Sequence, residues 1–237
     1  MRTILISGAN RGIGRKIAER AVKDGDQVSL GVRDSDQLIG TNLDPNFSRN
    51  KKILICKYES KSKQSAENWV RCTKNYFGKI DTLINCAGKF SKTKLMFQDN
   101  EVSEIEELWK TNVMGPWYLT RAAWEHLLEQ NDSRVINLVS MSGKRSKGSL
   151  AAYTTTKFAL MGLSQTIKNE GWEKGIRVTA ICPGWVNTDM AKEVKTINKS
   201  DMTQPEDLAE IISTILSMPN SCVPFEISVN CNLERMV

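Results

Sequence analysis

Short apolar runs alternate with amphipathic stretches along the whole chain. Runs of consecutive apolar residues predict strands that are buried on both faces, and they lie at residues 3–6, 27–32, 52–56, 81–85, 134–139, 176–182 and 225–230. Apolar residues at helical spacing predict helices at 13–22, 64–77, 101–111, 113–130, from the segment of Tyr153 to about 172, and at 205–216. Alternating strands and helices indicate a parallel sheet with helices on both faces.

The size of the chain fits one α/β domain. Its 237 residues, 40% of them hydrophobic, suffice for a sizeable core, and no repeat, low-complexity segment or linker interrupts them. We therefore expect a single domain over residues 1–237, with its longest irregular loop at 34–50. No run approaches the ~18 apolar residues of a membrane span, and the N-terminus turns polar too soon for a signal peptide. These features favour a cytoplasmic protein with no membrane partner.

Cysteine and histidine usage narrows the possible chemistry. The six cysteines show neither a C-x-x-C motif nor a metal-ligand spacing. Most lie in apolar runs, which predicts buried free thiols in a reducing compartment and no metal site. The single histidine, His126, is expected on a helix face. A chain with one histidine is a poor candidate for a catalytic histidine dyad or triad.

The net charge of +6 permits two interpretations. A basic surface can bind nucleic acid or another anionic partner. Here the lysines are dispersed, as at Lys61, Lys74 and Lys79, and no aromatic residues interleave them. This pattern favours a solvated surface without a nucleic-acid partner.

A glycine-rich turn, S-G-A-N-R-G-I-G, joins the first strand to the first helix, with glycines at Gly8, Gly12 and Gly14. Glycine permits a tight turn and lets a phosphate approach the backbone, while the following helix directs its amino end at that phosphate. The position between a strand and a helix is the context that a dinucleotide-binding turn needs. The alternative is a plain glycine turn.

The segment from Ser140 to Lys157 carries the candidate chemistry. Tyr153 and Lys157 are four residues apart, so on a helix they share one face about one turn apart. An ammonium beside a phenol favours the phenolate and brings its pKa closer to a useful range. Ser140 ends the apolar strand V-I-N-L-V, where its hydroxyl emerges at a carboxyl end. Without other support, such a Tyr–Lys pair is usually a surface pair.

Five motifs together are typical of one family. The G-x-x-x-G-x-G turn is followed by N-C-A-G at 85–88, N-V-M-G at 112–115, Ser140 with Tyr153 and Lys157, and P-G-W-V-N-T-D-M at 183–190. In this order they resemble the short-chain dehydrogenase/reductase family, over about residues 2 to 230, and the chain is also similar to small carbonyl reductases. The resemblance implies a Rossmann fold, a doubly wound parallel seven-stranded sheet of order 3-2-1-4-5-6-7.

The resemblance implies a catalytic group of four residues. Tyr153 is expected to protonate a carbonyl oxygen as hydride arrives, and Lys157 to bind the nicotinamide ribose and lower the Tyr153 pKa. Ser140, thirteen residues before Tyr153, is expected to bind the substrate oxygen, and Ser142 is the weaker candidate. Asn112 is expected to anchor a water that links Lys157 to solvent. Its alternative role is at a helix kink or cap.

The end of the second strand bears on the choice of cofactor. Family members that use NAD tend to have an aspartate where this chain has Val32, followed by Arg33. Arg33 and Arg11 could grip a 2′-phosphate by charge-assisted hydrogen bonds, which favours NADPH/NADP over NAD. The alternative is that Arg33 is a loop cation and Asp34 contacts the ribose.

The resemblance also assigns the remaining cofactor contacts. They lie in the glycine turn, at the end of the second strand, on the adenosine side, at the Tyr153–Lys157 pair and beside the nicotinamide amide. The residues are Gly8, Asn10, Arg11, Gly12, Ile13, Gly14, Arg33, Asn85, Ala87, Gly88, Tyr153, Lys157, Pro183, Gly184, Val186 and Thr188. The family's aspartate after strand three is missing, so Tyr58 or Glu59 must contact adenine, or the contact is lost. The chain's end lacks the glycine pair of many tetrameric members, which leaves homodimer, homotetramer and monomer open.

The expected function follows from these catalytic residues and cofactor contacts. The segment at about 188–205 would cover a carbonyl or alcohol substrate, with Trp185 and Met190 as apolar walls. The K-R-S-K stretch at 144–147 either favours an anionic substrate or is a solvated loop. The first hypothesis is an NADPH-dependent carbonyl reductase. The alternatives are 3-oxoacyl-thioester reduction and a non-catalytic NADP-binding redox sensor.

Overall fold

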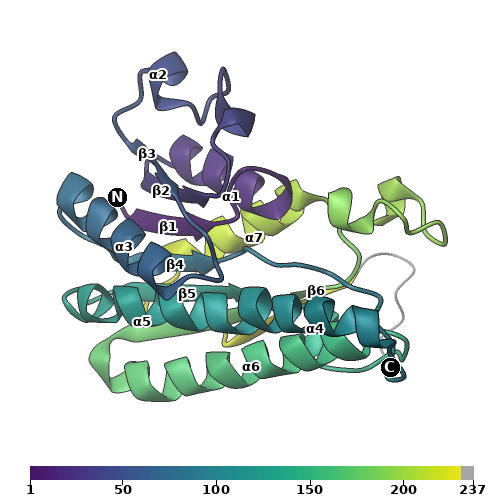
Figure 1. The fold of residues 1–237 in the computed structure, drawn as a ribbon. Helices are drawn as coiled ribbons and strands as arrows, with labels where there is room; N and C mark the ends of the chain where they lie inside the picture. The colour runs from purple at the N-terminus through teal and green to yellow at the C-terminus, as the bar shows by residue number, and fades with distance from the viewer. Residues whose placement is uncertain (231–237) are drawn as a thin grey trace.

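The computed structural model describes residues 1–230 and contains the predicted seven-stranded parallel sheet, in the order β3-β2-β1-β4-β5-β6-β7 (Figure 1). Each predicted strand is present, and its bounds differ from the expected ones by a few residues at most. The strands are β1 Thr3–Ser7, β2 Gln27–Val32, β3 Ile53–Lys57, β4 Thr82–Asn85, β5 Ser133–Leu138, β6 Ile176–Pro183 and β7 Glu226–Val229.

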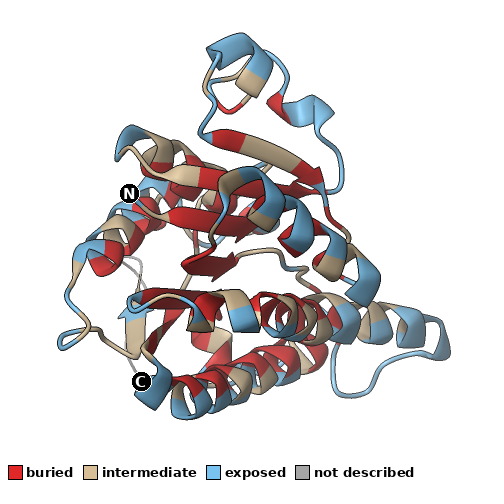
Figure 2. Cartoon of the chain, turned by 90° about the vertical axis from the view of Figure 1, so that its left-hand side faces the viewer, coloured by how far each residue is buried: buried red, intermediate tan, exposed pale blue. Residues whose placement is uncertain are grey.

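Helices cover both faces of the sheet, as the alternation predicts. They are α1 Gly12–Lys23, α2 Pro45–Ser48, α3 Lys63–Phe77, α4 Val102–Trp109, α5 Gly115–Leu128, α6 Ala151–Gly171 and α7 Pro205–Ser217. In β1, Ile4 and Ile6 pack in a core with α1 and α7, while Leu5 packs in a core with α3, α5 and α6. Figure 2 shows the buried strands between helices whose outer faces are exposed.

The order of the strands places the site. The chain leaves β1 towards β2 and β3 and later returns to β1's other side as β4. The carboxyl ends of β1 and β4 therefore lie at the point where the strand order reverses, and α/β sheets bind ligands in the crevice at this point. Ser7 and Asn85 end these two strands.

The helical region 101–130 differs from the prediction of two separate helices. A five-residue π-helical turn, Lys110–Met114, joins α4 directly to α5. Pro116 follows this turn, in the first turn of α5. Because proline has no N–H and its ring clashes with the carbonyl four residues earlier, it disturbs regular α-helical bonding there, and a π turn accommodates the disturbance.

The loop at 34–50 is less irregular than predicted, since it contains a 3-10 turn at Asp36–Leu38 and the short α2. Asp44 caps α2 by accepting a hydrogen bond from the Asn46 backbone N–H. Leu38 and Leu43 are fully buried and join the core beside β2 and β3. The loop is therefore anchored by two apolar side chains.

Tyr58, one of two candidates for an adenine contact, belongs to the core. It is 3% exposed, its ring lies 4.7 Å from that of Trp69, and its hydroxyl donates to the Gly115 carbonyl at 3.5 Å. Trp69 in turn lies over Gly31, where an added Cβ would come within 2.5 Å of the indole ring. This packing leaves Glu59 as the remaining candidate.

The prediction that the cysteines are buried is wrong at two positions. Cys56 and Cys182 are buried and Cys86 is partly buried, but Cys72 and Cys222 are exposed. Cys72 lies on the outer face of α3, and Cys222 lies in the loop between α7 and β7. On α3 the buried face carries Trp69, Val70 and Thr73, and Cys72 lies outside it. His126 lies on α5 as predicted, with Nδ1 3.2 Å from Glu129 Oε1.

Three expectations reach beyond the described residues. Cys231 and most of the C-terminal stretch without the glycine pair lie at 231–237, outside the described range. The single domain over 1–237 includes the same residues and stays a prediction. Among residues 1–230, no helix is long and apolar enough to cross a membrane.

Candidate active site

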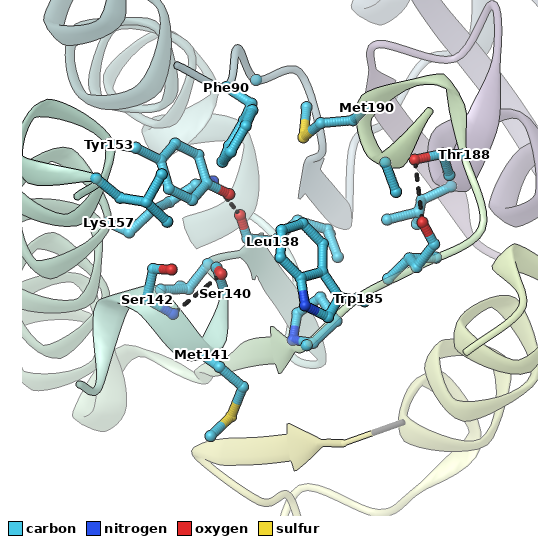
Figure 3. A pocket seen from close by; sticks show the side chains of 18 of the residues that line it. Phe90, Leu138, Ser140, Met141, Ser142, Tyr153, Lys157, Trp185, Thr188 and Met190 are labelled. Carbon is cyan, nitrogen blue, oxygen red and sulfur yellow. Dashed lines mark hydrogen bonds between the residues drawn. The ribbon is translucent and has the colours of Figure 1, made fainter. Parts of the chain in front are cut away.

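A cleft opens at the carboxyl ends of β4, β5 and β6 (Figure 3). It encloses about 970 Å³ of space that includes open solvent. Segments distant in sequence form its walls, and nine of the predicted site residues line it: Ile13, Gly88, Ser140, Tyr153, Lys157, Pro183, Gly184, Val186 and Thr188. Four of the five predicted motifs therefore contribute residues to one cavity, and N-V-M-G at 112–115 does not.

Tyr153 and Lys157 form a buried pair rather than a surface pair. They project from the first two turns of α6 and are 7% and 6% exposed. Lys157 Nζ lies 5.6 Å from the centroid of the Tyr153 ring and donates to the Leu138 carbonyl at 3.0 Å. Burial of two ionisable side chains beside a cleft marks a candidate catalytic site.

The ionisation of this pair is governed by burial. Loss of hydration disfavours charge, so it lowers the pKa of Lys157 to about 8 and raises the pKa of Tyr153 to about 12. A hydrogen bond with the Ser140 hydroxyl opposes the rise for Tyr153. Burial outweighs this hydrogen bond, so the pKa of Tyr153 lies above its usual value and not below it as expected.

Ser140 sits in a conformation that few non-glycine residues adopt, with φ +151° and ψ 158°. Its Oγ accepts a hydrogen bond from the Ser142 N–H at 3.0 Å, which closes the turn after β5. Figure 3 shows the Ser140 and Ser142 side chains facing the same cavity as Tyr153. Backbone conformations of this kind cost free energy and concentrate at functional sites.

Asn112 lies in the π turn and is 1% exposed. Its amide group accepts from the Lys89 N–H at 2.8 Å and donates to the Lys89 carbonyl at 2.8 Å, and it also donates to Thr156 at 3.1 Å. An added Cβ on Gly88 would lie 3.5 Å from Asn112 Oδ1 and 3.8 Å from Lys157 Nζ. Asn112 thus holds the segment after β4 and lies near Lys157, although it does not line the cleft.

The glycine turn is shaped by close backbone contacts. An added Cβ on Gly14 would lie 2.4 Å from the Gly8 carbonyl oxygen, and one on Gly8 would lie 2.9 Å from Ala87 Cα. Gly8 also has φ +70°. The turn therefore closes only with glycine at both positions, which leaves its backbone open to a ligand at the amino end of α1.

Gly14→Ala is expected to lower the free energy of unfolding by about 1–3 kcal/mol, since the added methyl group forces the turn apart, and to weaken cofactor binding about tenfold. Gly162→Ala is the matched control. Gly162 lies inside α6 with nothing within 4 Å of an added Cβ, so helix propensity predicts a gain of about 0.5–1 kcal/mol. Denaturant titration and cofactor fluorescence titration measure both effects. Equal stability of the two variants would contradict the assigned packing.

The two arginines proposed for the 2′-phosphate differ in their surroundings. Arg11 forms an exposed ion pair with Asp189 at 3.2 Å. Arg33 is exposed directly after β2. The alternative ribose contact, Asp34, accepts a hydrogen bond from the Asp36 N–H at 2.9 Å. One carboxylate oxygen of Asp34 is therefore already engaged in a local turn.

Two residues that were expected to contact the cofactor, Asn85 and Asn10, make side-chain hydrogen bonds within the protein. The Asn85 side chain is 2% exposed and donates to Asn137 at 2.9 Å and to Thr120 at 3.3 Å, so it points into the core. Asn10, at the turn, donates to Gln37 at 3.0 Å. The Asn85 side-chain nitrogen is thus engaged, while its Oδ1 is buried without a hydrogen-bond partner among the described residues.

Two residues of the site, Ser7 and Phe90, were not predicted from the sequence. Ser7 accepts hydrogen bonds from the Cys86 and Ala87 N–H groups at 3.0 and 3.1 Å, and so it ties the glycine turn to the segment after β4. Its signal was a polar residue ending an apolar strand. Phe90 packs edge-on against Tyr153 at 5.0 Å and faces Trp185 at 6.4 Å across the cleft. No local pattern marked Phe90.

Comparisons with known proteins identify the relatives of this chain. The family model described as short chain dehydrogenase matches residues 2–199. The agropine synthesis reductase of Rhizobium rhizogenes is 33% identical over 98% of this chain and 53% of the relative. An uncharacterized oxidoreductase of Staphylococcus aureus is 28% identical over 95% of both chains. The chain thus spans about half the length of the first of these relatives.

Solved structures share the fold. An alcohol dehydrogenase from Thermococcus sibiricus, complexed with 5-hydroxy-NADP, has a TM-score of 0.86 and 22% identity, and covers 100% of this chain and 99% of its own. ElxO with NADP bound has a TM-score of 0.84 and 21% identity, and covers 97% of each chain. With the family model matching most of its length, the chain belongs to the short-chain dehydrogenase family of oxidoreductases.

Proposed function

We propose that the protein is an NADPH-dependent reductase of a ketone or aldehyde, with Tyr153 as the general acid. The observation that carries this proposal is the buried pair of Tyr153 and Lys157 beside Ser140 in an open cleft. In the reverse direction the Tyr153 phenolate is the base for alcohol oxidation. The name of the Rhizobium relative, a reductase, is consistent with this reaction class.

The residues of the cleft have separate roles in the proposed reaction. A nicotinamide cofactor held in this cleft would supply the hydride. The Tyr153 hydroxyl donates its proton to the carbonyl oxygen, which Ser140 also binds, so that charge developing on this oxygen meets two donors. Lys157 holds the ribose and its ammonium favours the phenolate left behind. Asn112, close to Lys157, anchors the water through which the proton is replaced.

The glycine turn fits a dinucleotide. Gly8 and Gly14 leave the backbone bare at the amino end of α1, where the helix dipole favours a phosphate. We propose that the turn binds the pyrophosphate through Gly8, Asn10, Arg11, Gly12, Ile13 and Gly14. Ala87, Gly88 and the Asn85 backbone then bound the adenosine side, and Pro183, Gly184, Val186 and Thr188 the nicotinamide amide.

NADP is favoured over NAD because β2 ends in Val32 and Arg33 instead of an acidic residue. A second cation lies near Arg33. The Glu107 carboxylate raises the pKa of the Lys61 ammonium, and the charge of Arg33 opposes that rise. Because Lys61 pairs with Glu107 at 2.9 Å, Arg33 is the group proposed to meet a 2′-phosphate at this position. Arg11 can join it by leaving its exposed ion pair with Asp189, since exposed pairs contribute little to stability.

Arg33→Ala is expected to weaken NADPH binding at least tenfold while NADH binding stays unchanged, because a charge-assisted hydrogen bond to the 2′-phosphate is lost. Quenching of tryptophan fluorescence measures both affinities. Arg71→Ala, an exposed arginine on α3, is the control and should change neither. Equal or tighter NADH binding by the unchanged protein would point instead to NAD and to alcohol oxidation.

The segment 188–205 is proposed as the cover of the substrate. Its base is held by the hydrogen bonds from Asn187 N–H to the Thr203 carbonyl at 2.9 Å and from Thr203 N–H to the Trp185 carbonyl at 3.1 Å. Lys92, on the segment after β4, pairs with Glu193 at 2.8 Å. Both ends of the segment 188–205 are thus fixed, and the Lys92–Glu193 ion pair joins this segment to the segment after β4.

Two alternatives remain for the same site. Reduction of 3-oxoacyl thioesters would use identical catalytic groups, and steady-state assays with a thioester and a free ketone separate the two. A non-catalytic NADP-binding sensor would not need the acid, whereas this chain keeps Asn112, Ser140, Tyr153 and Lys157 together. Turnover of any carbonyl compound with NADPH excludes the sensor. We expect a small-molecule substrate in either case.

A further inference from the structure

Three apolar side chains from two segments of the chain form one wall of the cleft. Phe90 belongs to the segment after β4, and Trp185 and Met190 belong to the segment after β6. Figure 3 shows these three side chains around the opening, with the Tyr153 side chain beside them. A substrate whose carbonyl oxygen lies at the Tyr153 hydroxyl therefore has its neighbouring substituent at these apolar groups.

Phe90 makes contacts with two other aromatic rings at the cleft. Its ring centroid lies 5.0 Å from that of Tyr153 at an interplanar angle of 71°, and 6.4 Å from that of Trp185 at 72°. Both contacts are edge-to-face, one of the arrangements that aromatic rings prefer. Phe90 and Trp185 line the cleft and are each only half-buried. Part of each ring is therefore accessible to a ligand.

The position of Phe90 is fixed by hydrogen bonds on both sides of it in the chain. Before it, the Asn112 side chain bonds both the N–H and the carbonyl of Lys89, each at 2.8 Å. After it, Ser91 is buried and its Oγ accepts a hydrogen bond from the Thr93 N–H at 3.0 Å. These bonds hold the segment in place before a ligand binds, so packing a ligand against Phe90 costs little further ordering.

Apolar packing also supports Phe90 from the side away from the cleft opening. Phe90 packs against a cluster that contains Leu108 of α4 and Tyr153 of α6, and Leu108 is fully buried. Met190, on the segment 188–205, is instead 47% exposed. An unbranched thioether side chain adapts to its neighbours and makes favourable contacts with aromatic rings. The apolar wall thus combines a fixed aromatic ring with an adaptable side chain.

We propose that the substrate carries an aromatic ring close to its carbonyl group, and that Phe90 and Trp185 are the specificity-determining residues that contact this ring. An aromatic ring adds edge-to-face or offset contacts with both side chains, whereas a saturated ring of similar size only buries a similar apolar area. This inference rests on the proposed function, since it concerns the substrate of the same site. The proposed contacts of the nicotinamide amide are neighbours of Trp185 in the chain, so the effects on cofactor and substrate are measured separately.

The test compares phenyl compounds with cyclohexyl compounds, which are similar in size and differ in aromaticity. Two pairs are used: phenylacetaldehyde with cyclohexylacetaldehyde, and 1-phenylpropan-2-one with 1-cyclohexylpropan-2-one. A methylene group separates each ring from the carbonyl, so the two members of a pair differ little in intrinsic reactivity. Propanal and butan-2-one are the small carbonyl compounds without a ring. The kcat/KM of each compound is measured with NADPH in the unchanged protein, in Phe90→Leu and in Trp185→Leu.

Phe158→Leu and Trp117→Leu are the matched controls, because each removes the same kind of ring from an exposed position outside the cleft. Phe158 is 45% exposed on α6, and Trp117 is 53% exposed on α5. Loss of the Phe90 ring also removes a contact of Tyr153. A resulting shift of Tyr153 lowers kcat/KM for both members of a pair alike, so the ratio within a pair reports the contact with the substrate ring.

We expect each phenyl compound to be preferred about threefold or more over its cyclohexyl partner, and about tenfold or more over the small compound. The preference for phenyl over cyclohexyl should be lost in Phe90→Leu and Trp185→Leu and kept in the two controls, and the KM for NADPH should stay unchanged in all four variants. Equal use of phenyl and cyclohexyl compounds, equal use of the small compounds, a preference that survives both substitutions, or a raised KM for NADPH with the preference intact would overturn the inference. Turnover in those cases would leave the proposed function standing.

Absence of turnover for every compound would count against the proposed function, and calorimetry then decides the inference separately. 2-Phenylethanol and 2-cyclohexylethanol are titrated into the protein with NADP present. Tighter binding of 2-phenylethanol, lost in Phe90→Leu and kept in Phe158→Leu, supports an aromatic subsite. Equal binding of the two alcohols, or binding of neither, overturns it.

Discussion

Tyr153→Phe is expected to lower kcat for carbonyl reduction by about a thousandfold, within the 10²–10⁴ range of general acid catalysis. The substitution removes only the hydroxyl that donates the proton. Burial raises the pKa of Tyr153 to about 12, so the phenol keeps its proton at neutral pH until the carbonyl oxygen accepts it. The ring, which packs against Phe90 at 5.0 Å, stays in place. NADPH affinity should therefore change little.

Steady-state rates and fluorescence titration measure the two quantities in the same preparations. Tyr76→Phe is the control, because Tyr76 is 53% exposed on α3 and lies outside the cleft. It should keep full activity. If Tyr153→Phe also kept its activity, the proton donor would have to be another group, and the proposed mechanism would be wrong.

Lys157→Met is expected to abolish most of the activity while making the folded protein relatively more stable at neutral pH. Burial lowers the pKa of Lys157 from 10.5 to about 8. The unfolded chain therefore binds more protons than the folded one between these two values, and stability rises with pH across this window. Below about pH 8 the full cost of the buried charge is present, of order 3 kcal/mol for a shift of this size.

The measurement is the difference in unfolding free energy between Lys157→Met and the unchanged protein at pH 7 and at pH 10. Methionine has no charge, so the advantage of the variant should shrink by about 2–3 kcal/mol over this range. The hydrogen bond to the Leu138 carbonyl is lost in the variant at both pH values, and the part of it that depends on the charge of Lys157 is already contained in the pKa of Lys157. Lys51→Met, at an exposed lysine, should show no such trend. A constant difference for Lys157→Met would contradict the assigned desolvation.

According to these two predictions, the groups that carry out the reaction also lower the free energy of unfolding of the protein. A buried ammonium, a buried phenol and a serine with φ +151° lie together at the end of β5 and the start of α6. Each is unfavourable alone, and together they present a proton donor, a cation and a hydroxyl to one cavity. Stabilising substitutions at such positions commonly reduce function.

Much of the fold could be predicted because its signals are local. Apolar runs marked all seven strands, and the glycine turn marked the start of α1. The helical region 101–130 was harder to predict, because a π turn inside a helix and a break between two helices give similar sequence patterns. From the sequence alone Tyr58 is a possible ligand contact, because its burial depends on Trp69 and Gly115, which lie elsewhere in the chain.

The same limit applies to the site. Spacing alone indicated that Tyr153 and Lys157 share a helix face, and the motif set indicated which residues to consider. Whether the pair faced solvent or a cleft depended on the packing of α6 against β5 and β6. Likewise, Lys144 and Arg145 are adjacent, yet only Arg145 lines the cleft.

The sequence by itself determined the alternation of strands and helices, the glycine turn and the set of candidate catalytic residues, because these depend on residue type and short-range spacing. Only the tertiary structure decided the direction of the ionisable groups' pKa shifts, the structural role of Asn85, the exposure of Cys72 and the entry of Arg145 and Lys147 into the cleft. Burial, hydration and electrostatic fields arise from residues that are far apart in the chain, so they exist only once the chain has folded.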